Sequence, residues 1–295
     1  MSPATAIDGH KYLAEARELT DRLLEGYLPS CETEPRTLHQ AMRYSVMAGG
    51  KRLRPILVLA TYDYCGGEAS RAPQTVHPAM AALEMVHTYS LIHDDLPCMD
   101  DDDLRRGRPT CHKRFSEAVA TLAGDALHVV AFELMARTGS IDVIKELARS
   151  GGTAGMLGGQ IADIEAEGRK VNRAEIENIH RLKTAALIRG SVRIGALLAG
   201  AERNLLDRLS VYGEKIGLAF QIVDDILDIE GDQALLGKDV GSDTRNEKAT
   251  YPGVVGMDEA RRDASRLIDE ALQCFKPGED NMLMWLAGYI GQRNT

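Results

Sequence analysis

One stretch of the chain, from Tyr89 to Arg106, places six aspartates behind an apolar run and follows them with two arginines. Two carboxylates about 4 Å apart repel by roughly 4 kcal/mol at an effective dielectric constant near 20, so a folded site that holds several of them needs cations. Oxygen-only ligands favour Mg²⁺, which shares its remaining positions with water and phosphates. The two arginines can then form the other side of a phosphate clamp. The alternative is a solvated acidic loop. The aspartates are Asp94, Asp95, Asp100, Asp101, Asp102 and Asp103.

A second group of carboxylates, Asp224, Asp225 and Asp228, lies far downstream in another strongly apolar run. In a helix predicted over 205–230, Gln221 projects from nearly the same narrow face as Asp224 and Asp228, at about 100° per residue. Core residues border this face, so it does not resemble an ordinary solvated surface. The spacing therefore favours a metal-binding role for the second group.

A cluster of basic residues precedes both acidic groups. Two glycines lead into Lys51, Arg52 and Arg54, just before an apolar helix predicted over 56–64. Backbone amides at a helix start, together with lysine and arginine, can form a diphosphate cradle. A basic helix entry without a ligand is the alternative. His87 lies two turns before Asp94 on the same face of a helix predicted over 78–96, where it is either a ligand contact or a packing residue.

Asp94 and Asp100 are six residues apart, which in an ideal helix separates them by about 120°. Pro97 lies between them, and proline removes a backbone donor and crowds the preceding turn. We therefore predict that the helix ends or bends near Leu96 and Pro97, so that Asp100 returns to lie beside Asp94.

The composition predicts one large helical core. The 295 residues are 44% hydrophobic but only 5% aromatic, and they show no strand-like alternation and no linker, so we expect one domain over 1–295. A net charge of −9 argues against general nucleic-acid binding. Five cysteines without metal-binding spacing indicate reduced thiols in a cytosol, and we expect neither a signal peptide nor a membrane span.

The remaining pattern is helical with one long loop. Small residues form a stripe, called here the glycine stripe, at Gly151, Gly155, Gly159 and Ala162. The stripe fits either a tightly packed neighbouring helix or a ligand tail, with Gln160 and Asp163 as possible polar contacts. Asn172 and Glu175 resemble a capping box. The segment 231–248 reads as a loop of the kind that closes over sites. Other helices are predicted over 8–27, 34–48, 113–136, 140–150, 172–198, 258–275 and 280–291.

These motifs, in this order, resemble the short-chain trans-prenyl diphosphate synthases, and most closely the bacterial-type farnesyl diphosphate synthases. The resemblance covers nearly the whole chain. It implies an all-helical bundle around a deep central cavity (the isoprenoid synthase fold), usually a homodimer in the cytoplasm. It is carried by GGKRLRP, HTYSLIHDDLPCMDDDDLRRGRPTCH, the GGQ segment, HRLKTAALIR, FQIVDDILDIEGD and KATYP.

The resemblance also implies roles for individual residues. Mg²⁺, with three ions per active site, is bound by aspartates of both groups, as ligands or as their support: Asp94, Asp95, Asp100, Asp224, Asp225 and Asp228. The allylic diphosphate is gripped by Arg105, Lys183 and Lys238. Isopentenyl diphosphate is held by Gly50, Lys51, Arg54, His87 and Arg106. Thr184 and Gln221 face the developing allylic cation, and Lys248 assists the closed loop.

Product length in such enzymes depends on the cavity floor. Tyr89 lies about 7.5 Å before Asp94 along the helix, and the resemblance implies that Tyr89 and Ser90 stop elongation at a fifteen-carbon product. Alternatives within the same chemistry are a geranyl or geranylgeranyl diphosphate synthase. The intact Lys51, Arg54 and Arg106 argue against a terpene cyclase, which needs no second diphosphate site. A catalytically silent regulatory subunit is a remote alternative, because both acidic groups are complete.

Overall fold

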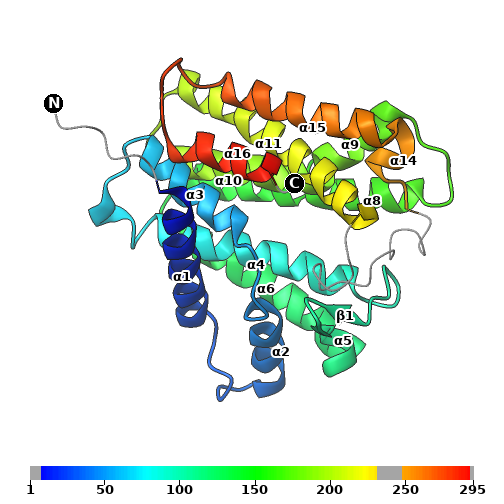
Figure 1. The fold of residues 1–295 in the computed structure, drawn as a ribbon. Coiled ribbons are helices and arrows are strands. Elements are labelled where there is room, and N and C mark those ends of the chain that lie inside the picture. Colours follow the sequence, from blue (N-terminus) through cyan, green and yellow to red (C-terminus); the bar gives the residue numbers. More distant parts are fainter. Residues whose placement is uncertain (1–7, 231–247, 293–295) are drawn as a thin grey trace.

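The computed structural model describes residues 8–230 and 248–292, and this part of the chain is almost entirely helical (Figure 1). The predicted all-α class is confirmed. The one sheet in it is a two-stranded hairpin of β1 (Leu104–Arg105) and β2 (Arg108–Pro109), whose strands are antiparallel. The helices of the first half are α1 (Gly9–Tyr27), α2 (Arg36–Val46), α3 (Leu53–Tyr64), η1 (Ala69–Arg71), α4 (Val76–Asp94), α5 (Cys111–Arg114), α6 (Glu117–Arg137) and α7 (Ile141–Gly151). Those of the second half are α8 (Met156–Ala166), α9 (Arg173–His180), η2 (Arg181–Ala185), α10 (Ala186–Leu198), α11 (Arg203–Glu230), α14 (Tyr251–Val255), α15 (Met257–Leu272) and α16 (Met282–Gln292).

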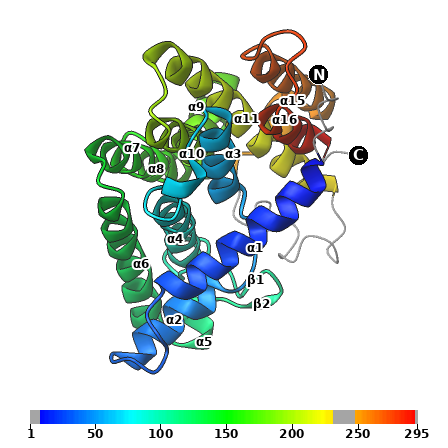
Figure 2. The ribbon, with the colours of Figure 1, turned by 90° about the vertical axis from the view of Figure 1, so that its left-hand side faces the viewer.

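The long helices pack in a sequence that brings distant parts of the chain together. Helix α4 packs against α6 and α3, α10 packs against α3 and α11, and α11 packs against α15. Figure 2 shows α6 at one side of the molecule and α15 with α16 at the other. Two clusters of buried aliphatic side chains fill the interior, one around α4 and α6 and one around α11 and α15. Leu59 and Leu197 pack against both clusters and so connect them; one domain over 1–295 stays a prediction.

Local signals explain several helix starts. The capping box predicted for Asn172 and Glu175 is present at the start of α9. Helix α6 begins at Glu117, later than predicted, because Ser116 is extended and its side chain accepts a hydrogen bond from the Val119 amide. Helix α3 begins earlier than predicted, at Leu53, because Arg52 before it adopts a left-handed conformation with φ of 52°.

One expectation about helix continuity was wrong, and a second helix spans its predicted range with a change of winding inside it. The glycine stripe does not run along one helix, because α7 ends at Gly151 and α8 begins only at Met156. The helix predicted over 172–198 is interrupted by the π-helical turn η2, Arg181–Ala185. Such turns insert one extra residue per turn and are frequent at functional sites.

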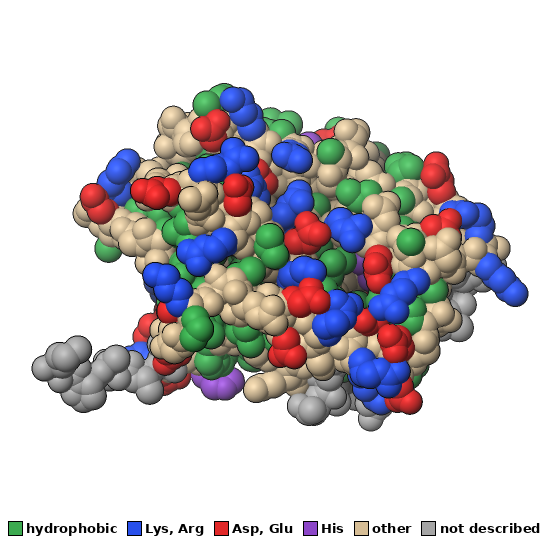
Figure 3. All heavy atoms as spheres, turned by 90° about the horizontal axis from the view of Figure 1, so that it is seen from above, with side chains coloured by type: hydrophobic (Ala, Val, Ile, Leu, Met, Phe, Trp, Pro, Cys, Tyr) green, Lys and Arg blue, Asp and Glu red, His purple; other side chains and the backbone are tan. Residues whose placement is uncertain are grey.

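The surface carries charges of both signs, and one helix is strongly apolar. On the face seen in Figure 3, lysine and arginine are interspersed with aspartate and glutamate, so neither sign of charge dominates there. Among the described helices, α6 is the one long and apolar enough to cross a membrane by length and composition. It packs extensively against α4 and also against α2, and core helices meet the same criterion.

Candidate active site

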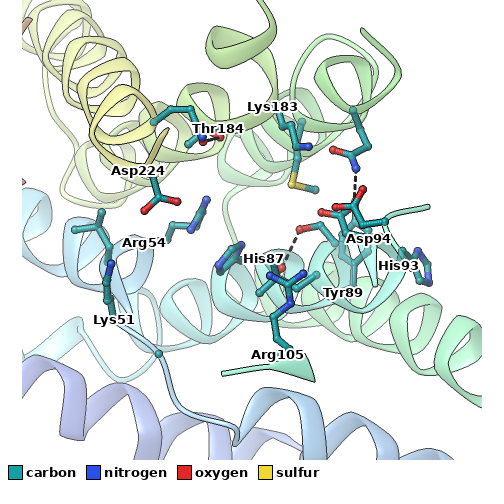
Figure 4. A pocket seen from close by; sticks show the side chains of 18 of the residues that line it. Lys51, Arg54, His87, Tyr89, His93, Asp94, Arg105, Lys183, Thr184 and Asp224 are labelled. Atoms are coloured by element: carbon teal, nitrogen blue, oxygen red, sulfur yellow. Dashed lines mark hydrogen bonds between the residues drawn. The ribbon is translucent and has the colours of Figure 1, made fainter. Parts of the chain in front are cut away.

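A cavity of about 940 Å³ lies between α4 and α11, and both acidic groups line it. Figure 4 shows Asp94 from α4 and Asp224 from α11 on opposite sides of the same hollow, with Arg54 and Lys183 between them. The prediction that two acidic groups remote in sequence meet across one cavity is therefore confirmed. The cavity is also lined by Tyr89, Ser90, Leu157, Ile161 and Ile164, so it joins a charged end to an apolar one.

The end of α4 folds as Pro97 predicts, although the helix stops two residues earlier than Leu96. The Asp100 amide donates a 2.8 Å hydrogen bond to the Asp94 carbonyl, which brings Asp100 back beside Asp94. The Gln160 side chain of α8 donates to the Asp94 carboxylate at 2.6 Å. Burial raises the pKa of Asp94 above its ordinary value; Lys183 opposes this shift, and the Asp100 charge adds to it. A carboxylate with a raised pKa gains more from a nearby cation than a solvated one does.

Asp95 occupies a different position from its neighbour. Its side chain is buried, and it accepts hydrogen bonds from the Arg105 guanidinium, one of them at 2.8 Å from Nε. Burial raises the pKa of Asp95 to about 6, against the attraction of Arg105. Arg105 also contacts Asp102 at 3.2 Å while it lines the cavity. Of its two expected roles, Asp95 fits that of support, because it holds Arg105 toward the cavity.

The π-helical turn η2 presents Lys183 and Thr184 to the cavity. Lys183 pairs with Asp163 of α8. Burial lowers the pKa of Lys183, but Asp163 and Asp94 outweigh this effect and raise it to about 12, so the ammonium group stays charged. A Cβ at Gly159 would lie 2.1 Å from the Lys183 backbone nitrogen, so Gly159 serves tight helix packing. At Gly159, therefore, the small residue allows a close helix contact and does not make room for a ligand tail.

A hydrogen-bond chain links Thr184 to the second acidic group. The Thr184 hydroxyl donates to the Gln221 side-chain oxygen at 2.5 Å, and the Gln221 amide donates to Asp225 at 2.8 Å. Asp225 also accepts from the Tyr251 backbone amide at 2.7 Å and lies 3.4 Å from His180. Asp225 is buried and its carboxylate holds the surrounding groups, and it lines the cavity together with Asp224 and Asp228.

The predicted cradle of basic residues forms the side of the cavity next to Asp224. Lys51, Arg54, His87 and Arg106 all line it. Arg106 donates to the Gly49 carbonyl, and a Cβ at Gly50, where φ is 137°, would lie 2.7 Å from the Arg106 guanidinium. The glycine at position 50 therefore permits Arg106 to lie against the loop.

Two members of this cradle show the electrostatic signature of an anion site. Burial lowers the pKa of Arg54 to about 10; the Glu84 carboxylate opposes this shift and the Arg106 charge adds to it. The Arg54 Nε has no hydrogen-bond partner among the described residues. Burial also lowers the pKa of His87 well below its ordinary value, and Arg54 and Arg106 add to the effect. Positive charge therefore exceeds its local compensation here, as an anionic ligand requires.

Arg52 does not belong to the cradle, although it lies between Lys51 and Arg54. Its guanidinium is buried and pairs with Glu84 at 2.8 Å and with Asp21 at 2.9 Å. Sequence reasoning grouped all three basic residues together and did not identify Glu84. A signal was available, because Glu84 is an acidic side chain within the otherwise apolar first half of α4 and must be paired if buried.

The remaining predicted residues divide by location. Lys248 contacts Asp100 at 2.6 Å and lines the cavity. Lys238 and most of the predicted loop lie outside the described residues. Asp101 and Asp103 are exposed and face Lys113, at 3.9 and 2.7 Å. The roles of these two aspartates, which the sequence left open, are therefore consistent with solvated pairing.

The carboxylate oxygens of the cavity fit Mg²⁺ ions whose remaining coordination positions are filled by a bound substrate. Asp94, Asp100, Asp224 and Asp228 supply carboxylate oxygens to one cavity, and oxygen is the ligand that Mg²⁺ prefers. Within 8–230 and 248–292, no three acidic, histidine or cysteine side chains are grouped closely enough to enclose a metal by themselves. Ions that bridge protein carboxylates and substrate phosphates do not need such an enclosure.

The fold and the cavity together define an all-helical protein whose carboxylates and basic side chains are suited to metal ions and diphosphates. Residues 35–286 match the polyprenyl synthetase family, so the chain belongs to this family. The prediction that the protein is a trans-prenyltransferase is confirmed.

Relatives of known name support this assignment. The chain is 50% identical to a farnesyl diphosphate synthase of Escherichia coli over 86% of this chain and 89% of the relative. It is 44% identical to a heterodimeric geranylgeranyl pyrophosphate synthase large subunit of Arabidopsis thaliana, over 100% of this chain and 82% of the relative. The crystal structure of a Helicobacter pylori geranyltransferase complexed with magnesium and isoprenyl diphosphate superposes with a TM-score of 0.85, at 32% identity and 97% coverage of both chains.

Proposed function

We propose that the protein condenses isopentenyl diphosphate with dimethylallyl or geranyl diphosphate to give farnesyl diphosphate and pyrophosphate. The observation that carries this proposal is one cavity with two cation-rich sides, one at Asp94 with Lys183 and Arg105 and one at Arg54. Two diphosphates need two such sides, whereas a cyclase needs only one. Several bacterial relatives named farnesyl diphosphate synthase support the same product.

The allylic diphosphate is held at the first side. Asp94, Asp100 and Asp224 would bind Mg²⁺, three ions per site, and when bound these ions neutralise the charge that develops on the departing pyrophosphate. Arg105, fixed by Asp95, and Lys183, fixed by Asp163, contribute permanent positive charge at the same place. Because these cations are already oriented in the free protein, little reorganisation is needed when the carbon–oxygen bond breaks.

The hydroxyl of Thr184 is oriented for the carbocation that this cleavage leaves. Its hydrogen points to Gln221, so its oxygen lone pairs are available to the cavity. The isopentenyl double bond, held by Lys51, Arg54, His87 and Arg106, attacks the cation and forms the new carbon–carbon bond. A proton is then lost from isopentenyl carbon 2, and the released pyrophosphate accepts it. Leu157 and Ile161 shield the hydrocarbon from water.

A direct assay tests the reaction. We expect the purified protein to consume labelled isopentenyl diphosphate only when an allylic diphosphate and Mg²⁺ are both present, with EDTA abolishing turnover and added Mg²⁺ restoring it. Chromatography of the dephosphorylated products identifies the chain length. Failure to form any longer prenyl alcohol under these conditions would contradict the proposed function.

The fifteen-carbon product depends on Tyr89, which is buried and lines the apolar end of the cavity. Replacing it by alanine removes a ring that closes this end, so we expect Tyr89→Ala to shift the main product to twenty carbons or more while isopentenyl diphosphate is still consumed. Product chromatography measures the shift. An unchanged distribution would contradict Tyr89 as the floor, whereas a ten- or twenty-carbon product from wild type would favour a geranyl or geranylgeranyl diphosphate synthase.

A catalytically silent subunit is the remote alternative, and one plant relative is named as the large subunit of a heterodimeric geranylgeranyl pyrophosphate synthase. Such a subunit would bind a partner and show no turnover alone. The assay described above separates the two functions, because a silent subunit would form no product alone. The complete lining of the cavity by both acidic groups and the cradle favours turnover.

We further propose a cytoplasmic homodimer. Leu122 and Val129 lie seven residues apart on one face of α6 and are 58% and 69% exposed. Clustered exposed apolar side chains commonly mark contact surfaces. We expect Val129→Glu to shift the protein from dimer to monomer in light scattering after gel filtration. Val211→Glu, at an exposed apolar position on α11, is the matched control and should leave the mass unchanged.

A further inference from the structure

The aromatic side chain at the cavity floor is held by a second ring from another helix. The Tyr89 and His128 rings lie with centroids 4.6 Å apart and planes tilted by 30°. His128 in turn contacts Phe132, one turn further along α6, at 5.2 Å. The three rings therefore form a column that leads from the cavity toward α6.

The Tyr89 ring depends on this packing for its position. Its hydroxyl is buried and has no hydrogen-bond partner among the described residues, so no polar contact made by these residues fixes the ring. The second neighbouring ring, His93, is itself fixed, because its Nε2 lies 3.0 Å from the Thr121 carbonyl and a Cβ at Gly124 would clash with it at 2.2 Å. His93 meets Tyr89 edge-on at 5.8 Å, whereas His128 stacks against its face.

His128 lies next to the exposed face of α6 that we propose as the dimer surface. The next residue, Val129, is 69% exposed, and Leu122 on the same helix is 58% exposed. His128 is half-buried, and burial lowers its pKa, so the ring packs as a neutral aromatic group at pH 7. Removing both rings would extend the apolar end of the cavity toward the outer face of α6.

We propose that His128 is a positioning residue for product length: stacked on Tyr89, it holds that ring across the end of the cavity and forms the next barrier if Tyr89 is removed. This inference rests on the proposed prenyl chain elongation. It assigns to α6 a role in product choice that the acidic groups and the cradle do not have.

Product analysis of a small set of variants tests the proposal. We expect His128→Ala to raise the ratio of twenty- to fifteen-carbon product by at least about tenfold, equivalent to about 1.4 kcal/mol in relative barriers. His128→Phe keeps a ring and should leave the ratio within about threefold of wild type. Tyr89→Ala/His128→Ala should give longer products than Tyr89→Ala alone. His128→Leu replaces the alanine variant if the latter does not fold.

The outcomes separate this proposal from the proposed function. If wild type forms farnesyl diphosphate and His128→Ala leaves the product ratio unchanged, the role of His128 is refuted and the proposed function stands. Equal disturbance by His128→Phe and His128→Ala would also refute it, because stacking would not be the cause. If wild type forms no condensation product, the proposed function fails and this inference fails with it.

Discussion

Asp224→Asn and Asp94→Asn should each reduce turnover by about 10²- to 10³-fold, because removal of one group that stabilises developing charge has effects of this size. Both carboxylates line the cavity from opposite sides, so each contributes to the charge of the same diphosphate site. Asparagine keeps the shape of the side chain but carries no charge, which weakens binding of a divalent cation. The measurement is kcat with saturating substrates, together with a Mg²⁺ titration that should shift to higher concentrations.

Asp101→Asn provides the matched control from the same acidic run. Asp101 is exposed and lies 3.9 Å from Lys113, and a surface ion pair of this kind contributes at most about 1 kcal/mol. Its φ of 49° is also a conformation that asparagine adopts readily. Turnover of this variant should remain near that of wild type. A comparable loss in Asp101→Asn, or normal turnover in Asp224→Asn, would contradict the assignment of the metal-binding residues.

The sequence predicted the arrangement within each acidic group because the relevant constraints are local, whereas the meeting of the two groups at one site was implied by the family resemblance. The 3.6-residue period places Asp224, Asp228 and Gln221 on one face whatever the helix packs against, and Pro97 ends α4 wherever it lies in the fold. The backbone hydrogen bond from Asp100 to Asp94 follows directly from that ending. The helical class was predictable for the same reason, since periodicity and composition acted together over most of the chain.

The sequence could not separate residues that share a charge but differ in their partners. Arg52 and Arg54 look equivalent in sequence, yet Arg52 is paired with Glu84, whereas the Arg54 Nε has no partner in the part of the chain that the structure describes. Asp94 and Asp95 are adjacent, yet only Asp94 lines the large cavity. The π-helical turn that presents Lys183 was also missed, because it depends on packing against Gly159 and not on local propensity.

Substitution of Arg54 should weaken substrate binding, whereas substitution of Arg52 should lower the stability of the fold. Arg54→Met removes a buried charge whose pKa is lowered to about 10 by burial and, more weakly, by Arg106, although Glu84 opposes this. The group remains charged at pH 7, so the free protein bears its desolvation cost, and a bound diphosphate offsets it. We expect the KM for isopentenyl diphosphate to rise by about 10- to 100-fold, because a hydrogen bond to a charged group contributes about 1.5–3 kcal/mol. The KM for the allylic substrate should change little.

The stability of the ligand-free variants distinguishes a binding arginine from a structural one. Arg54→Met should unfold at the same denaturant concentration as wild type or a higher one, because a buried charge is replaced by an apolar side chain of similar length. Arg52→Met breaks the buried pair with Glu84 and should lower the free energy of unfolding by about 3–5 kcal/mol. Denaturant titrations of both variants measure this difference. A strongly destabilised Arg54→Met whose KM for isopentenyl diphosphate is unchanged would show that Arg54 supports the fold and does not bind this substrate.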